Sequence, residues 1–283
     1  PGVFTVLHGD KVAVDGLLTH PDVKAISFVG STPIARYVYE TGTAHGKRVQ
    51  ALGGAKNHMV VLPDADLDLA ADAAVNAGFG SAGERCMAIS ALVVVEPVAD
   101  ALVAKIVERM AQLTTGDGRD GADMGPLVSG PHRDKVVSYV EAGVAAGAEL
   151  VVDGRATVPA GEGFWLGPTL FDKVDTSMSI YAEEIFGPVL SVLRVTSYDE
   201  ALAMVNEHPY GNGTALFTHD GGAARRFQFE VQVGMVGINV GVIATEHVPF
   251  GGIKQSGLGR EGSSHGMDEY IEMKFLCLGD IQK

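Results

Sequence analysis

The sequence is poor in basic residues, in cysteines and in long apolar runs, and each shortage excludes a class of protein. The 21 lysines and arginines are outnumbered by 35 acidic residues, so the net charge is −14. Such a chain is a poor partner for nucleic acid or for an anionic membrane surface. Its longest apolar run, residues 89–95, is far shorter than the ~20 residues that a membrane-spanning helix needs. We therefore expect no nucleic acid and no membrane among its partners.

Cys86 and Cys277 are the only cysteines, which is too few for a disulfide framework and is typical of a reducing compartment. We therefore predict a cytoplasmic protein. The histidines show no spacing typical of metal ligands, so we expect no structural or catalytic metal. Apolar residues, in contrast, are plentiful: 46% of the 283 residues are hydrophobic and 20% are charged. That balance predicts one large globular domain or two ordinary ones and excludes a disordered chain.

Short β-rich runs alternate with helical patterns, which is typical of an α/β protein with mainly parallel strands. The expected strands cover residues 3–7, 25–29, 47–52, 58–62, 149–153, 189–195, 214–218 and 235–240. The expected helices cover residues 11–18, 32–45, 98–113, 130–147, 198–208 and 223–231, with another after Asp66. The pattern restarts at Gly53-Gly54, which predicts a boundary between two α/β domains. An apolar tail at 270–278 is a candidate edge strand that reaches a partner subunit.

Two stretches, residues 78–83 and 257–262, match the dinucleotide fingerprint G-x-G-x-x-G. The fingerprint works only between a strand and a helix, because helix N-terminal amides must face the pyrophosphate. The first stretch follows an expected helix and the second follows a loop, so we interpret both as chance matches.

A cysteine and a pair of glutamates lie in contexts that suggest chemistry. Cys86 follows Arg85, and a neighbouring cation favours the nucleophilic thiolate. The alternative is a buried cysteine that acts as a small hydrophobic residue, and spacing alone does not separate the two. Residues 183–188, Glu-Glu-Ile-Phe-Gly-Pro, combine carboxylates for ribose hydroxyls with a ring for a flat heterocycle. Here the alternative is a solvated helix end followed by a turn.

Taken together, the motifs resemble the aldehyde dehydrogenase superfamily, in order and over the whole chain. They are Phe-Val-Gly-Ser-Thr at 28–32, Leu-Gly-Gly-Ala-Lys-Asn at 52–57, Gly-Glu-Arg-Cys at 83–86, Glu-Ile-Phe-Gly-Pro at 184–188, and Pro-Phe-Gly-Gly with Ser-Gly-Leu-Gly-Arg-Glu within 249–261. Up to about Asn239 the chain looks most like methylmalonate/malonate-semialdehyde dehydrogenases, and from Gly241 its tail looks more like succinate-semialdehyde dehydrogenases. The resemblance implies an α/β fold with the remainder of a Rossmann-type NAD-binding domain at 1–54, a catalytic domain at 55–250, and a C-terminal loop and oligomerisation tail at 251–283.

The resemblance also implies roles for particular residues. Cys86 would be the nucleophile, with Asn239 and Glu261 in the substrate and proton-relay region. The positions implied for the cofactor are Gly30, Ser31, Gly53, Glu184 and Phe186. From its own chemistry, Arg85 beside the nucleophile could hold a substrate carboxylate. The alternative for Arg85 is a structural ion pair with Glu84 or another acid.

The implied function is NAD-dependent oxidation of a small semialdehyde through a Cys86 thioester. No carboxylate lies within residues 49–54, where hydrolytic relatives place a general base, so we expect CoA to discharge the thioester as a co-substrate. The alternatives are a hydrolytic enzyme of succinate-semialdehyde type, with Glu261 as the base, and a non-catalytic chain. Family chains are nearly twice as long and form homodimers or homotetramers. We therefore expect these 283 residues to begin inside the cofactor-binding domain and to be a poor catalyst alone.

Overall fold

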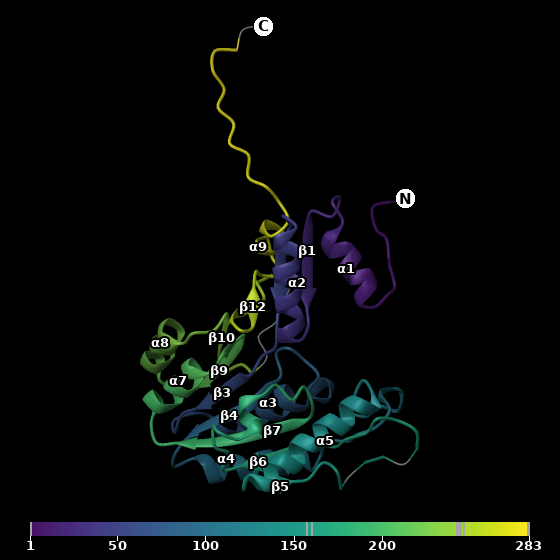
Figure 1. The fold of residues 1–283 in the computed structure, drawn as a ribbon. Coiled ribbons are helices and arrows are strands. Elements are labelled where there is room, and N and C mark those ends of the chain that lie inside the picture. The colour runs from purple at the N-terminus through teal and green to yellow at the C-terminus, as the bar shows by residue number, and fades with distance from the viewer. Residues whose placement is uncertain (1, 157, 160, 242–244, 246, 282–283) are drawn as a thin grey trace. The chain divides into compact units, whose positions relative to one another are not determined.

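A computed structural model of the chain describes residues 2–156, 158–159, 161–241, 245 and 247–281, which divide between two compact units (Figure 1). The first unit comprises Pro1–Gly53, Thr245–Phe250 and Gly257–Lys283, and the second comprises Gly54–Ala244 and Gly251–Ser256. The division falls between Gly53 and Gly54, where the sequence pattern restarts. The C-terminal region alternates between the units, whereas the sequence boundaries set residues 251–283 apart as one segment.

The first unit is built around a three-stranded sheet. Its elements are α1 (Lys11–Thr19), β1 (Ala25–Val29), α2 (Thr32–Ala44), β2 (Arg48–Leu52), β12 (Gly257–Leu258) and α9 (His265–Asp268). β1 and β2 are parallel, and β12 runs antiparallel to β2. The predicted strand at 3–7 is wrong: Val3 and Phe4 are 97% and 85% exposed. These residues pair with no strand in the described part of the chain, and a strand requires such a neighbour for its backbone hydrogen bonds.

The second unit contains a seven-stranded sheet in the order β10-β9-β3-β4-β7-β6-β5. The strands are β3 (Asn57–Val61), β4 (Ile89–Val95), β5 (Glu149–Val152), β6 (Thr169–Asp172), β7 (Val189–Val195), β9 (Gly213–Phe217) and β10 (Met235–Ile238). All neighbouring pairs are parallel except β5 and β6, so the predicted, mainly parallel α/β architecture is confirmed. A small antiparallel pair is formed by β8 (Tyr210–Gly211) and β11 (Ile253–Lys254).

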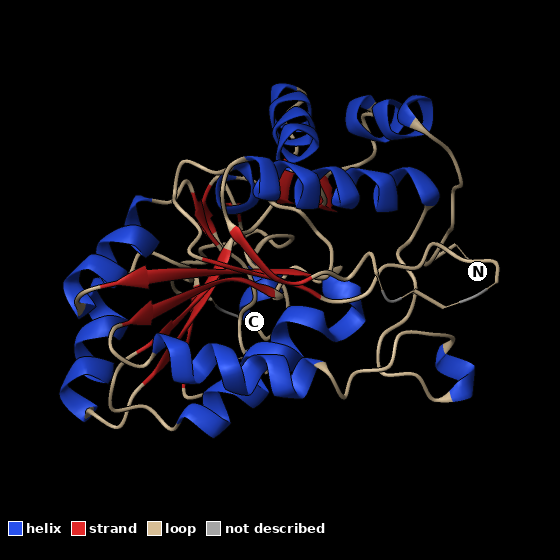
Figure 2. Cartoon of the chain, turned by 90° about the horizontal axis from the view of Figure 1, so that it is seen from below, coloured by secondary structure: helices blue, strands red, loops and turns tan. Residues whose placement is uncertain are grey.

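Helices cover both faces of this sheet (Figure 2). They are α3 (Leu67–Phe79), α4 (Ala99–Met110), α5 (Gly130–Ala145), α6 (Ser179–Ala182), α7 (Tyr198–Glu207) and α8 (Gly221–Glu230), with 3-10 turns at Gly80–Gly83 and Gly118–Asp120. Successive strand residues point to opposite faces. In β3, therefore, Met59 packs with α3 and α4, and Val60 packs with α7 and α8. None of the described helices is long and apolar enough to cross a membrane.

Histidine and tyrosine rings form a cluster around His58, a buried residue of β3. His58 Nε2 lies 3.1 Å from the Tyr181 hydroxyl, and the His208 ring lies 5.4 Å from the His58 ring, centroid to centroid. His208 also stacks on Tyr210 and accepts the backbone N–H of that residue at Nδ1. Burial, followed by the charge of nearby Lys56, lowers the pKa of His208 to about 4. Burial also lowers the pKa of His58 well below its usual value.

These depressed values make stability dependent on acid pH. The unfolded chain binds a proton at each histidine near pH ~6.5, whereas folded His208 excludes it down to about pH 4. Stability is therefore lost as the pH falls below ~6.5, by up to about 1.4 kcal/mol per pH unit for each such histidine. We expect His208→Phe to flatten this loss, because phenylalanine keeps the ring stack and cannot titrate. Thermal unfolding midpoints measured between about pH 4 and 7 check this, and equal slopes for both proteins would contradict it.

Candidate active site

Four segments of the second unit meet at the amino ends of parallel strands. Asn57 begins β3, Gly213 begins β9, the turn carrying Cys86 precedes β4, and the turn carrying Glu184 precedes β7. Because parallel strands share one direction, these starting points lie at the same edge of the sheet. A narrow cavity is lined there by Ala55, Asn57, Gly78, Gly83, Arg85, Cys86, Ala88, Ile89, Ser90, Glu184, Ile185, Phe186 and Gly187. The structure thus brings together the predicted nucleophile, the arginine beside it and two predicted cofactor residues.

The turn that presents Cys86 has an unusual backbone. After α3 ends, Ser81 and Ala82 adopt left-handed φ values of 54° and 53°. Gly83 follows with a φ of 69°, and a Cβ there would lie 2.2 Å from the Gly187 carbonyl oxygen. Only glycine permits this approach, so the turn packs directly against the segment that carries Glu184. Non-glycine residues in this conformation cost free energy and are concentrated at functional sites.

The start of β3 fixes the Glu184 turn. The Ala55 backbone N–H donates to Glu184 Oε1 at 3.0 Å. The Lys56 ammonium donates to the carbonyls of Ile180 and Glu183, at 2.7 and 3.0 Å. Burial lowers the pKa of Lys56 to about 7, and burial raises the pKa of Glu184 above its usual value. Lys56, which no sequence signal marked as part of the site, thus holds the backbone that leads into this turn.

Arg85 lies in the cavity wall, where its Nη2 is 3.4 Å from Ser81 Oγ. Within the described residues Arg85 forms no ion pair, and the suggested partner Glu84 is engaged elsewhere. Glu84 Oε1 accepts the Val128 backbone N–H at 3.1 Å and lies 3.4 Å from His132 Nε2. The guanidinium is therefore not committed to a neighbouring carboxylate.

Phe186 places an aromatic ring at the cavity. Its backbone is left-handed, with a φ of 56°, and its side chain is 40% exposed. His132 Nε2 lies 2.7 Å from the Phe186 carbonyl oxygen, and the two rings meet edge to face. His132, which the sequence analysis missed, thus contacts the segments before both Cys86 and β7.

One predicted site residue of the second unit, Asn239, lies away from this cavity. Asn239 follows β10, at the opposite, carboxyl edge of the sheet, where its amide accepts the Thr218 N–H and donates to the Thr218 carbonyl, each at 3.0 Å. The catalytic role of Asn239 stays a prediction, and its two hydrogen bonds to the Thr218 backbone give the amide a structural role.

The remaining predicted residues belong to the first unit. Ser31 is the N-cap of α2, and the Gly30 N–H donates to the Leu52 carbonyl at 3.1 Å, one residue before Gly53. Glu261 exchanges two backbone hydrogen bonds with Phe250, at 2.7 and 2.8 Å. The cofactor roles of Gly30, Ser31 and Gly53 and the proton-relay role of Glu261 stay predictions.

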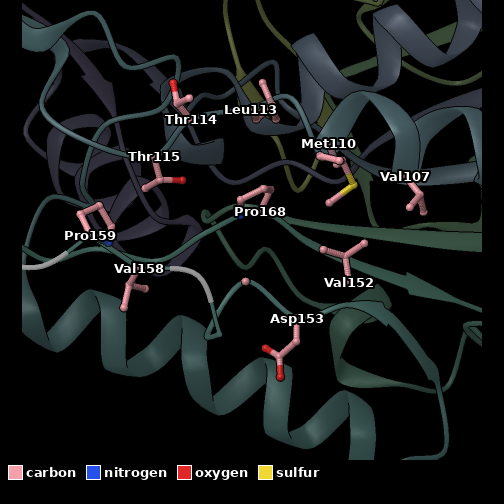
Figure 3. Close-up of a pocket in the computed structure, with 12 residues that line it drawn as sticks. Val107, Met110, Leu113, Thr114, Thr115, Val152, Asp153, Val158, Pro159 and Pro168 are labelled. Carbon is pink, nitrogen blue, oxygen red and sulfur yellow. The ribbon is translucent and has the colours of Figure 1, made fainter.

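A wider cavity of about 520 Å³ opens between the end of α4 and residues 152–168, where Met110, Val152 and Pro168 surround it (Figure 3). Its walls are mostly apolar, and Asp153, which also lines it, is paired with Arg155. The described residues that line it include no cysteine, histidine or lysine, so the smaller cavity at Cys86 is the better candidate for chemistry. In the described part of the chain, no group of three or more acidic, histidine or cysteine side chains could hold a metal ion.

The chain is similar to known semialdehyde dehydrogenases. A malonate-semialdehyde dehydrogenase of Pseudomonas aeruginosa is 59% identical over 260 residues, which cover 90% of this chain and 52% of that protein. The crystal structure of methylmalonate-semialdehyde dehydrogenase from Oceanimonas doudoroffii matches with a TM-score of 0.91 at 49% identity, covering 93% of this chain and 55% of that one. A structure from Sinorhizobium meliloti 1021, complexed with NAD, matches with the same values.

The chain spans about half the length of the curated relatives it matches. Residues 1–276, nearly the whole of this chain, match the model of the aldehyde dehydrogenase family. The α/β fold is shared with the matching solved structures over more than nine-tenths of this chain. The chain belongs to the aldehyde dehydrogenase family.

Proposed function

We propose that the protein oxidises a small semialdehyde through a thioester on Cys86, in the manner of malonate- or methylmalonate-semialdehyde dehydrogenases, and passes the acyl group to CoA. The observation that carries this proposal is the shared cavity of Cys86, Arg85 and Glu184. A thiol, a guanidinium that forms no ion pair among the described residues, and a carboxylate that could accept hydrogen bonds from ribose all line this cavity. The names of the relatives support a semialdehyde substrate.

The residues of this chain suit NAD as the cofactor. The Glu184 carboxylate can accept hydrogen bonds from ribose hydroxyls, and the half-exposed Phe186 ring can pack beside a flat heterocycle. In the first unit, the N-terminus of the 13-residue helix α2, beside Gly30 and Ser31, suits an anionic phosphate group. Bound NAD supplies the hydride acceptor that aldehyde oxidation requires.

The chain's own residues then account for the covalent chemistry. The Cys86 thiolate attacks the aldehyde carbon, and the backbone N–H of Cys86 donates to the oxyanion that forms. Loss of hydride from this adduct leaves an acyl thioester on Cys86. CoA, after its thiol has lost a proton to solvent, attacks the thioester carbonyl as a thiolate, which releases Cys86 as a thiolate and forms an acyl-CoA. Arg85 orients the substrate through the carboxylate at the end opposite the aldehyde.

We further propose a homodimer or homotetramer that works in the cytoplasm. The tail that follows α9 exposes the apolar side chains of Met273, Phe275 and Leu278, and a second copy of the chain would remove them from water. A catalytic thiol requires a reducing compartment, because oxidation removes its nucleophilicity.

A substitution of Arg85 tests this proposal. We expect Arg85→Leu to lower kcat/KM about 10- to 100-fold for malonate semialdehyde, mainly through KM, because a charge-assisted hydrogen bond contributes about 1.5–3 kcal/mol. Propanal has no carboxylate and should lose much less. Steady-state NADH formation with both aldehydes, in the protein expressed from its complete reading frame, measures the difference.

Two further variants serve as controls. Arg85→Lys keeps the charge but loses the bidentate fork, and should retain part of the preference. Ser81→Ala removes only the hydrogen bond between Arg85 and Ser81 and keeps the guanidinium, so it should retain most of the preference for malonate semialdehyde. Equal losses on malonate semialdehyde and propanal in Arg85→Leu would contradict the assignment. An absence of NADH from every aldehyde in the unmodified protein would contradict the proposed function itself.

A further inference from the structure

The carbonyl oxygen of Cys86 accepts two side-chain hydrogen bonds from distant parts of the chain. Asn57, the first residue of β3, donates through Nδ2 at 2.8 Å, and Asn212, just before β9, donates through Nδ2 at 2.9 Å. Both asparagines are buried, with exposed fractions of 2% and 7%. Burying an amide is costly unless its polar atoms are bonded. Here the bonds of two buried amides converge on the residue that carries the nucleophile.

The orientation of the Asn57 amide is fixed by its partners. Its Oδ1 accepts the Gly213 backbone N–H at 3.0 Å, and its Nδ2 also donates to the Ala88 carbonyl at 2.9 Å. Reversing the amide would place its oxygen against two carbonyl oxygens and its NH₂ group against an N–H. Asn57 therefore connects β9 to both ends of the Cys86–Ala88 segment in a single arrangement.

We propose that Asn57 and Asn212 are positioning residues, which fix the Cys86 peptide so that its thiol and backbone N–H are held in the geometry needed for attack on the aldehyde. The inference rests on the proposed function for the identity of that reaction. The positioning role itself is inferred from the strained turn before Cys86, where Ser81 and Ala82 are left-handed. A strained turn persists only where surrounding contacts hold it, and the two amides provide such contacts at its far end.

A matched set of variants tests the proposal in the protein expressed from its complete reading frame. Asn57→Leu keeps the approximate shape of the side chain and removes the amide. Asn212→Ala removes one of the two donors to Cys86. The control is Thr214→Val: Thr214 is buried on β9 and donates to the His58 carbonyl at 2.8 Å. The variant Thr214→Val therefore removes a hydrogen bond between β3 and β9 that does not involve Cys86.

Two readouts separate positioning from general stability. Hydrogen exchange measured by mass spectrometry reports how firmly the turn at residues 81–88 is held, and it needs no substrate. The pre-steady-state burst of NADH reports formation of the Cys86 thioester. We expect Asn57→Leu to speed exchange in the turn about tenfold and to slow the burst about 10- to 100-fold, because a small misplacement of a reacting group is costly. The KM for NAD should stay within about twofold, since neither asparagine is among the residues assigned to the cofactor.

Thr214→Val should leave turn exchange and burst unchanged. Asn212→Ala should act in the same direction as Asn57→Leu but less strongly, and the double variant should show less than the summed effect, because both donors share one acceptor. If turn exchange or the burst in Asn57→Leu equals that in Thr214→Val, the proposal is overturned. Should Asn57→Leu not fold, an unchanged turn in Asn212→Ala overturns it equally. A protein that oxidises no aldehyde would refute the proposed function and leave the exchange comparison intact.

Discussion

Replacing Cys86 by alanine is expected to abolish NADH formation, by at least about 10⁴-fold, while cofactor binding is retained. The variant lacks the only thiol among the described residues that line the cavity at Cys86, so no thioester can arise. Glu184 and Phe186, the residues proposed to contact the cofactor in the second unit, are unchanged in it. A burst experiment measures the first effect, and calorimetric titration with NAD measures the second.

Cys277→Ser is the matched control for this experiment. Cys277 is exposed in the tail that follows α9, far along the chain from the nucleophile turn, and the two thiols are not joined in a disulfide. We expect this variant to keep the burst of the unmodified protein. Near-normal turnover in Cys86→Ala, or loss of the burst in Cys277→Ser alone, would show that the nucleophile has been assigned to the wrong residue.

Local sequence patterns predict elements well where the reason for the element is itself local. β1 and β7 have the predicted bounds, because each is an apolar run closed by turn residues. β6 was missed because both ends of this four-residue strand are polar. Thr169 Oγ1 accepts the Gly154 N–H, and Asp172 pairs with Arg194 at 2.6 Å. These partners come from other elements, so no local signal announces that the strand is buried.

The false strand at 3–7 shows the converse. Its alternation of apolar residues is as good as that of β1, but a strand is completed by a neighbour, and the pattern contains no information about the neighbour. The stretch at 78–83 was interpreted correctly for a physical reason. In the structure Gly78 and Phe79 are the last residues of α3, and residues 80–83 form the strained turn, so the stretch closes a helix and presents no helix N-terminus to a pyrophosphate.

The candidate site likewise contains residues that the sequence reveals and residues that it does not. Cys86, Glu184 and Phe186 could be anticipated because their side chains are chemically distinctive and occur in motifs. Asn57 and Asn212 could not, because their shared partner is a backbone carbonyl, which every residue possesses. That partner lies 29 residues from Asn57 and 126 residues from Asn212 in the sequence. Only the common direction of β3, β4 and β9 brings the three together.

The acyl acceptor is expected to be CoA, with water at least about 10²-fold slower. Residues 49–54 contain no carboxylate that could activate water. In the structure, Gln50 is the buried polar residue of β2, and its Oε1 accepts hydrogen bonds from the Ser27 and Tyr270 hydroxyls, at 2.7 and 2.9 Å. An amide in this state cannot act as a general base. Ala51 and Leu52 complete the strand as buried apolar residues.

A thiol acceptor needs no such base, because a thiol near neutral pH is already partly thiolate and is intrinsically nucleophilic. We therefore predict that the Cys86 thioester accumulates without CoA: one burst of NADH followed by a slow steady state. Adding CoA should raise the steady rate about 10²- to 10⁴-fold and convert the product to an acyl-CoA. Where the substrate carries a β-carboxylate, as malonate semialdehyde does, loss of CO₂ should accompany the reaction and the product should be acetyl-CoA.

The alternative acyl acceptor is water, which the Glu261 carboxylate could activate through a chain of waters. The variant Glu261→Gln distinguishes this hydrolytic mechanism from the CoA mechanism. On the CoA mechanism, this variant keeps the CoA-dependent rate, because no step in that mechanism needs the carboxylate. On the hydrolytic mechanism, it loses about 10²- to 10⁴-fold in release of free acid. Mass spectrometry of the products, with and without CoA, distinguishes them. Rapid steady-state formation of free acid without CoA, abolished by Glu261→Gln, would replace CoA by water as the acceptor and make Glu261 the general base.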